Sequence, residues 1–167
     1  MKKLFLWLII VLIIAVFSLA GCNAKSAVKE VEVDSSNPEG VKFVAPESGS
    51  YEITIVGGAY CYLPQEDPNW SIYGGWRTML HLYINKPVEW EASNEWGLSP
   101  VNFDSTIGPD KSISTVAEAE ATGKGSSVAV HLDEGEYIII LVYDGSDYYF
   151  DNSGMVKVHI AGPLSNE

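Results

Sequence analysis

Alternating apolar and polar residues predict β-strands along most of the chain after residue 40. In a strand, successive side chains point to opposite faces, so a period of two marks a strand with one buried face. This period occurs at residues 51–55, 79–84, 128–132 and 156–160, and a continuous β-branched run at residues 137–143 favours a central strand. Helix-like composition is confined to residues 115–121. Short strands separated by turns predict an all-β jelly-roll sandwich over residues 41–163.

Two long connections interrupt this pattern, at residues 57–78 and 91–125. Long loops without secondary structure are uncommon in compact domains and are often functional. The first connection is rich in aromatic residues, and Trp90 precedes the second. Several of these side chains are expected to cap the ends of the sandwich. Trp70 and Tyr73 lie among turn residues, and we predict that they form a platform for the apolar face of a sugar ring.

The N-terminus has the pattern of a secretion signal. Lys2 and Lys3 precede an apolar run at residues 4–17, which is short for a membrane span and typical of a signal-peptide core. The sequence Leu-Ala-Gly before Cys22 resembles the bacterial lipoprotein signal. The resemblance implies removal of residues 1–21 and a diacylglyceryl thioether on the Cys22 sulfur. Two or more acyl chains such as palmitate would then hold an extracytoplasmic protein on a membrane. An ordinary signal peptide and a single membrane anchor are the alternatives.

Residues 22–40 are expected to contain the lipidated cysteine and a flexible tether, because small, polar and charged residues dominate them. With Cys22 lipidated, Cys61 has no partner in the chain, and this excludes a disulfide framework. Cys61 is therefore expected to be a small buried residue.

The charge of the chain limits its partners. Ten Lys and Arg residues stand against 22 Asp and Glu, a formal charge of −12. Because Lys2 and Lys3 leave with the signal, 8 basic residues remain against 22 acidic ones, a charge of −14. Binding to nucleic acid needs a basic footprint and is excluded by this balance. Electrostatic docking on anionic lipid is disfavoured for the same reason.

Oxygen-bearing side chains concentrate between the last two predicted strands, where residues 144–152 hold three carboxylates and one amide. Calcium takes six to eight oxygen ligands from carboxylates, amides and backbone carbonyls. Asp144 and Asp151 would neutralise such an ion, and Asn152 would add a neutral oxygen. An EF-hand is excluded, because the sixth loop position is Tyr149 where that motif requires Gly. On composition alone, an acidic solvated turn explains the segment equally well.

Residues 143–160 resemble the calcium loop and final strand of the PA-I type galactose-binding bacterial lectins. Those lectins are small jelly-roll sandwiches, galactose-binding-domain-like in fold, whose calcium ion binds the protein and two sugar hydroxyls together. The resemblance implies a calcium site with these ligands: the side chains of Asp144, Asp151 and Asn152, and the carbonyls of Tyr148 and Tyr62. It also implies that the three side-chain ligands contact the sugar. Tyr62 is included because Thr54-Ile55-Val56 and Tyr62-Leu63-Pro64 are similar to an early segment of the family.

This chain departs from the family pattern in the early loop. The family has a His-Pro-Asp-Gln segment there that contacts the sugar, whereas residues 65–76 contain no His. A preference for galactose is therefore not implied. Asp151 stands where the family has Asn, which adds charge to the site and leaves a metal role intact.

Enzymatic chemistry is not predicted. His81, His131 and His159 lack zinc-ligand spacing, and the chain has neither an HExxH nor a GxSxG motif. We therefore predict a non-catalytic, membrane-anchored lipoprotein whose β-sandwich binds carbohydrate through calcium. One alternative is a structural or protein-interaction module in which calcium only stabilises the loop. Another is an unrecognised hydrolase.

Overall fold

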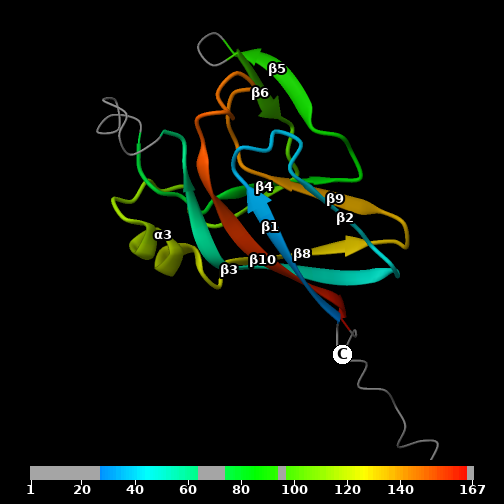
Figure 1. The fold of residues 1–167 in the computed structure, drawn as a ribbon. Helices are drawn as coiled ribbons and strands as arrows, with labels where there is room; N and C mark the ends of the chain where they lie inside the picture. Colours follow the sequence, from blue (N-terminus) through cyan, green and yellow to red (C-terminus); the bar gives the residue numbers. More distant parts are fainter. Residues whose placement is uncertain (1–26, 64–73, 94–96, 165–167) are drawn as a thin grey trace, which may run out of the picture.

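The computed structural model describes residues 27–63, 74–93 and 97–164, and most of them lie in two antiparallel sheets (Figure 1). The first sheet contains, in spatial order, β1 (Ala27–Asp34), β10 (Ser153–Leu164), β3 (Gly49–Cys61) and β8 (Ser127–Leu132). The second contains β2 (Val41–Val44), β9 (Tyr137–Leu141), β4 (Leu80–Ile84) and β7 (Ser105–Ile107). The described residues also form a hairpin of β5 (Glu89–Ser93) and β6 (Gly97–Val101), and the helix α3 (Val116–Gly123).

The strand pairing is that of a jelly roll. With the β5–β6 hairpin set aside, the antiparallel pairs are nested along the chain: β1 with β10, β2 with β9, β3 with β8 and β4 with β7. Two further pairs, β10 with β3 and β9 with β4, join these into the two sheets. This nesting is the double Greek key of jelly-roll sandwiches. The predicted fold class is confirmed.

The core lies between the two sheets and is built from alternate residues of the strands. Ile53 and Ile55 of β3 face Leu80 and Leu82 of β4, and all four side chains are fully buried. Each such side chain contributes about 1.5–3 kcal/mol through burial. Strand β9 lies between β2 and β4, so the β-branched run is central, as predicted.

The expected flexible tether is wrong over residues 27–34, which form β1 at the edge of the first sheet. Val31 and Val33 point into the core and alternate with exposed Glu30 and Glu32. The mixed composition of the segment concealed this short period of two. The sandwich therefore begins at Ala27, and residues 22–26 lie outside the described part of the chain.

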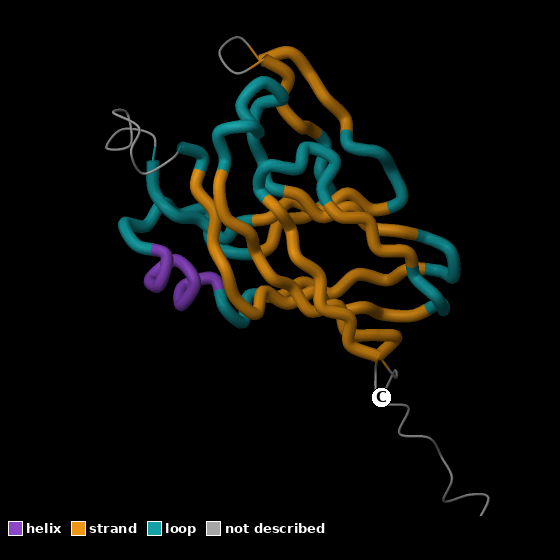
Figure 2. The backbone as a smooth tube through the Cα atoms, in the orientation of Figure 1, coloured by secondary structure: helices purple, strands orange, loops and turns teal. Residues whose placement is uncertain are grey.

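The two connections contain more secondary structure than expected (Figure 2). Strand β3 continues to Cys61, so the first connection begins later than predicted. The second contains β6, β7 and α3, and the helix begins after the N-cap Thr115, whose hydroxyl accepts a hydrogen bond from the Glu118 amide. None of the helices in the described residues is long and apolar enough to cross a membrane.

Candidate functional site

The candidate site lies in the loop between β9 and β10, which packs firmly on the end of the sandwich. The Tyr149 side chain is buried, and its hydroxyl donates to the Val142 carbonyl at 2.5 Å. Burial raises the pKa of Tyr149 far above its usual range, so the hydroxyl keeps its proton. At the other end of the loop, Asn152 Nδ2 donates to the carbonyl of Ser35 at 3.0 Å. These contacts hold the loop in one conformation.

Asp144 supplies a buried carboxylate oxygen to this site. Its Oδ1 accepts a hydrogen bond from the Gly145 amide at 2.7 Å, whereas its Oδ2 is buried with no hydrogen-bond partner in the described residues. The pKa of Asp144 is raised to about 6, chiefly by burial and to a smaller extent by the nearby charge of Asp151. The Gly145 amide and the adjacent Asn152 amide act in the opposite direction. The metal-free site therefore holds more negative charge than it can solvate well.

Asn152 supplies a second buried oxygen. Its side chain is only 7% exposed, and because Nδ2 faces Ser35, Oδ1 points the other way. That oxygen is buried and accepts no hydrogen bond from the described residues. A buried acceptor left unsatisfied costs about 1–3 kcal/mol. Two such oxygens beside a second carboxylate fit a hard cation, which prefers oxygen ligands.

The two predicted carbonyl donors lie near these side chains. The Tyr148 carbonyl accepts a hydrogen bond from the Asp151 amide at 3.1 Å, and a carbonyl oxygen keeps a second lone pair for another partner. The Tyr62 ring packs on Tyr60 with a centroid distance of 5.5 Å. Cys61 at the end of β3 pairs with Ser153 at the start of β10, so the backbone of Tyr62, the next residue, lies close to Asn152. Within the described residues, no three His, Cys, Asp or Glu side chains form a metal-binding group.

Three predicted functional residues cannot be placed. Trp70 and Tyr73, the proposed sugar platform, and Cys22, the proposed lipidation site, lie outside the described residues. Their roles stay predictions. Cys61 is buried and free, as expected, and its sulfur lies 3.1 Å from the Ser153 hydroxyl.

Ser35 is a supporting residue that the sequence did not indicate. It lies just after β1 and is fully buried, and both its amide and its hydroxyl donate to the Gly154 carbonyl, at 3.2 and 2.8 Å. Together with the bond from Asn152, these contacts fasten the end of β1 to the start of β10. Ser35 lies in the segment that the sequence predicts to be a flexible tether. A single serine in a turn-like segment does not indicate that its side chain fastens two strands.

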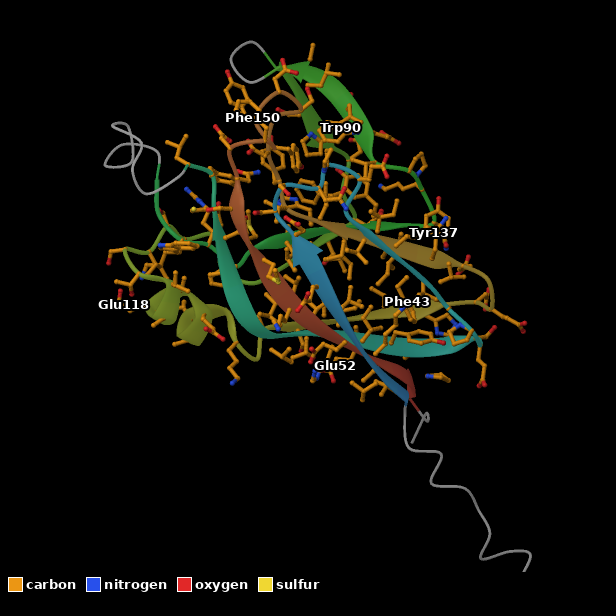
Figure 3. All side chains as sticks on the ribbon, in the orientation of Figure 1. Phe43, Glu52, Trp90, Glu118, Tyr137 and Phe150 are labelled. Carbon is orange, nitrogen blue, oxygen red and sulfur yellow. The ribbon has the colours of Figure 1, made fainter. Side chains whose placement is uncertain are left out.

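The β5–β6 hairpin lies beside the loop between β9 and β10 (Figure 3). The Ser146 amide donates to the Leu98 carbonyl at 2.7 Å, and Trp90 meets Tyr149 edge-on with 6.0 Å between ring centroids. Trp90 and Leu98 also line an open, mainly apolar groove of about 460 Å³. At the tip of the loop, the Phe150 side chain is 83% exposed. Aromatic side chains therefore lie in and beside the loop that holds the oxygen cluster.

His81 is buried on the opposite face of β4 from the core. Its ring packs edge-on against Phe103 with 4.3 Å between centroids, and 5.1 Å from the ring of Tyr143. Burial lowers the pKa of His81 to about 4, so the imidazole is neutral at pH 7. His81 therefore packs as a neutral ring against Phe103 and Tyr143. The side chains of His131 and His159 are 67% and 39% exposed and lie near the carboxylates of Asp133 and Glu30.

Comparison with known proteins gives one distant structural likeness. No family model matches the chain, and no curated protein matches it. Among solved structures, the chain is similar to one described as "EclA N-terminal domain; PllA-like lectin", at 15% sequence identity and a TM-score of 0.36. The match covers 79% of this chain and 93% of that chain. A likeness this distant transfers neither a site nor a ligand.

Proposed function

We propose that this β-sandwich binds carbohydrate through a calcium ion held by the loop between β9 and β10. The observation that supports the proposal is the proximity of Asp144, Asp151 and Asn152, where Asp144 Oδ2 and Asn152 Oδ1 are buried and accept no hydrogen bond from the described residues. The loop's resemblance to the PA-I type lectins supports the choice of ion and ligand.

The chain's own residues suit this ion. Asp144 and Asp151 match its double charge, and Asn152 Oδ1 adds a neutral oxygen from the buried side of the loop. The carbonyls of Tyr148 and Tyr62 are the remaining donors in the proposed set. A calcium ion with open positions in its coordination shell can bind sugar hydroxyls directly. Phe150, exposed beside the cluster, offers an aromatic face to the apolar side of a sugar.

Calorimetric titration of the metal-free protein with calcium tests the metal site. We expect Asp144→Asn to weaken binding by about 10-fold or more, because a charged ligand becomes neutral in a buried position. Asp147→Asn is the matched control, since Asp147 is exposed in the same loop and its carboxylate contacts Ser146. An equal loss of calcium affinity in both variants would mean that only the total charge of the loop determines calcium binding. Unchanged binding in Asp144→Asn would refute the site.

A glycan array tests the ligand. Parent protein with calcium is expected to bind a defined set of glycans, and a chelator is expected to abolish the binding. Asp144→Asn should lose the same glycans, and Asp147→Asn should keep them. Glycan binding that survives the chelator would overturn the role of the ion.

One observation favours a second candidate function, in which calcium only stabilises the fold. The proposed ligand Asn152 bonds to Ser35, so an ion at this site would fasten β1 and β10 as well as the loop. In that case calcium would raise the melting temperature of the protein while no glycan binds above background.

The membrane anchor on Cys22 is part of the proposal. It is supported by the lipoprotein-like signal at residues 1–22. Metabolic labelling with a palmitate analogue in a bacterial host should modify the parent and leave Cys22→Ser unmodified. A labelled Cys22→Ser variant would show that the lipid is attached elsewhere.

A further inference from the structure

Strand β1 links the two ends of the sandwich. Its first residue, Ala27, pairs with Gly162 near the end of β10, and its last residue, Asp34, pairs with Met155 near the start. Eight residues of extended strand span about 26 Å at roughly 3.3 Å per residue. The chain therefore enters the domain at one end and reaches the other before its first turn.

The candidate site lies at the far end from this entry point. The loop containing Asp144 and Asn152 directly precedes β10, and Ser35 fastens it to the last residues of β1. Ala27 and the end of β10 lie together at the opposite end, where Figure 1 shows β1 beginning and β10 ending. Figure 3 shows Phe150 and Trp90 far from this end.

The distance from the lipid to the domain is short. Cys22 precedes Ala27 by five residues, which reach at most about 18 Å when fully extended. If the tether had extended to residue 40, its length would have let the domain turn freely. Because β1 is a rigid part of the sheet, the anchor instead holds the Ala27 end close to the bilayer. Val28 and Leu164, 58% and 36% exposed, add apolar surface on the strands at this end.

We propose that the end of the sandwich formed by Ala27 and Leu164 faces the anchoring bilayer, and that the oxygen cluster points away from it. This inference rests on the lipid anchor proposed for Cys22. The ligands within reach are then those on a facing surface or in solution, and the headgroups of the protein's own membrane are out of reach.

Headgroup quenching tests this orientation with the lipidated chain in phospholipid vesicles. A fluorophore is attached at Leu164→Cys or at Asp147→Cys, and spin-labelled headgroups act as the quencher. We expect several-fold stronger quenching at position 164 than at position 147. The parent protein is the labelling control, because Cys61 is buried and Cys22 carries the lipid.

A second variant separates orientation from simple attachment. Ten Gly and Ser residues inserted between Ala24 and Lys25 lengthen the tether, and we expect the contrast between positions 164 and 147 to shrink several-fold. Equal quenching at both positions without the insertion would overturn the proposal. So would stronger quenching at position 147, or a chain that does not float with the vesicles. Because the assay contains neither calcium nor sugar, a failure of the lectin proposal would leave its result unchanged.

Discussion

Strand β9 has an acidic connection at each end. A carboxylate in the first has a lowered pKa, and a carboxylate in the second has a raised pKa. In the turn before it, the Asp133 amide donates to the Glu136 carboxylate at 2.7 Å. This bond and the Asn85 side chain lower the pKa of Glu136, whose side chain is partly exposed. In the loop after β9, burial raises the pKa of Asp144 to about 6. Each connection holds three carboxylates, and only the loop after β9 buries one of its carboxylate oxygens beside the buried Asn152 amide.

The largest expected difference is between a glycine just after the loop, Gly154 at the start of β10, and a glycine in the turn, Gly135. Gly154 has φ +97°, and a Cβ there would lie 2.3 Å from the Ala59 carbonyl oxygen. We expect Gly154→Ala to lower the free energy of unfolding by about 3 kcal/mol or more, through backbone strain and overlap. Gly135 has φ +83° with open space around it, so Gly135→Ala should cost only about 1 kcal/mol. Urea denaturation of both variants measures the difference, and equal losses would contradict the packing of the loop.

Calcium should stabilise the loop and leave the turn unaffected. At a calcium concentration 100 times the dissociation constant, we expect about 2.7 kcal/mol of added stability. Thermal unfolding with calcium and with chelator measures this gain. Glu136→Gln should retain the gain and Asp144→Asn should lose most of it. A gain that survives in Asp144→Asn would place the ion elsewhere.

The two connections should give opposite pH dependences in metal-free protein. The folded pKa of Asp144 lies above its ordinary value of 3.8, so between about pH 4 and 6 the folded state binds more protons than the unfolded state. Asp144 therefore makes the protein less stable as the pH rises through this window. Glu136, with a lowered pKa, adds stability above its ordinary pKa of 4.5 and loses it as the pH falls through the folded value.

Melting temperatures in chelator from pH 4 to 7 check these signs. Asp144→Asn should remove the destabilising trend, and Glu136→Gln should leave that trend in place. If the parent and Asp144→Asn have the same pH profile, Asp144 is not buried as described.

The smallest expected difference in stability is between two serine variants, one beside each connection. Ser35→Ala removes the buried bond to the Gly154 carbonyl, and we expect a loss of about 1 kcal/mol. Ser48 accepts a bond from the Glu134 amide in the exposed turn, and Ser48→Ala should cost about half as much or less. Chemical denaturation of both variants gives the ranking. A larger loss of stability for Ser48→Ala than for Ser35→Ala would contradict the greater burial of the Ser35 hydrogen bond.

Local patterns predicted the strands well because a period of two is a property of neighbouring residues. Ile53 and Ile55 alternate with exposed or half-buried polar residues, and this alternation matched β3. Strand β1 was missed because its two core valines lie in a segment of polar composition. The β5–β6 hairpin was missed because the alternation of Trp90 and Ala92 with Glu89 and Glu91 is short, and because Pro100 in β6 is uncommon inside a strand.

By itself, the sequence determined the all-β class, the central position of β9 and the spacing of Asp144, Asp151 and Asn152. These features depend on residues that are close along the chain. Only the tertiary structure showed that Asp144 Oδ2 and Asn152 Oδ1 are buried, and that Ser35 supports them. It alone placed the loop at the opposite end of β1 from Ala27. Burial and solvation depend on atoms that folding brings together from distant segments, and no local pattern records them.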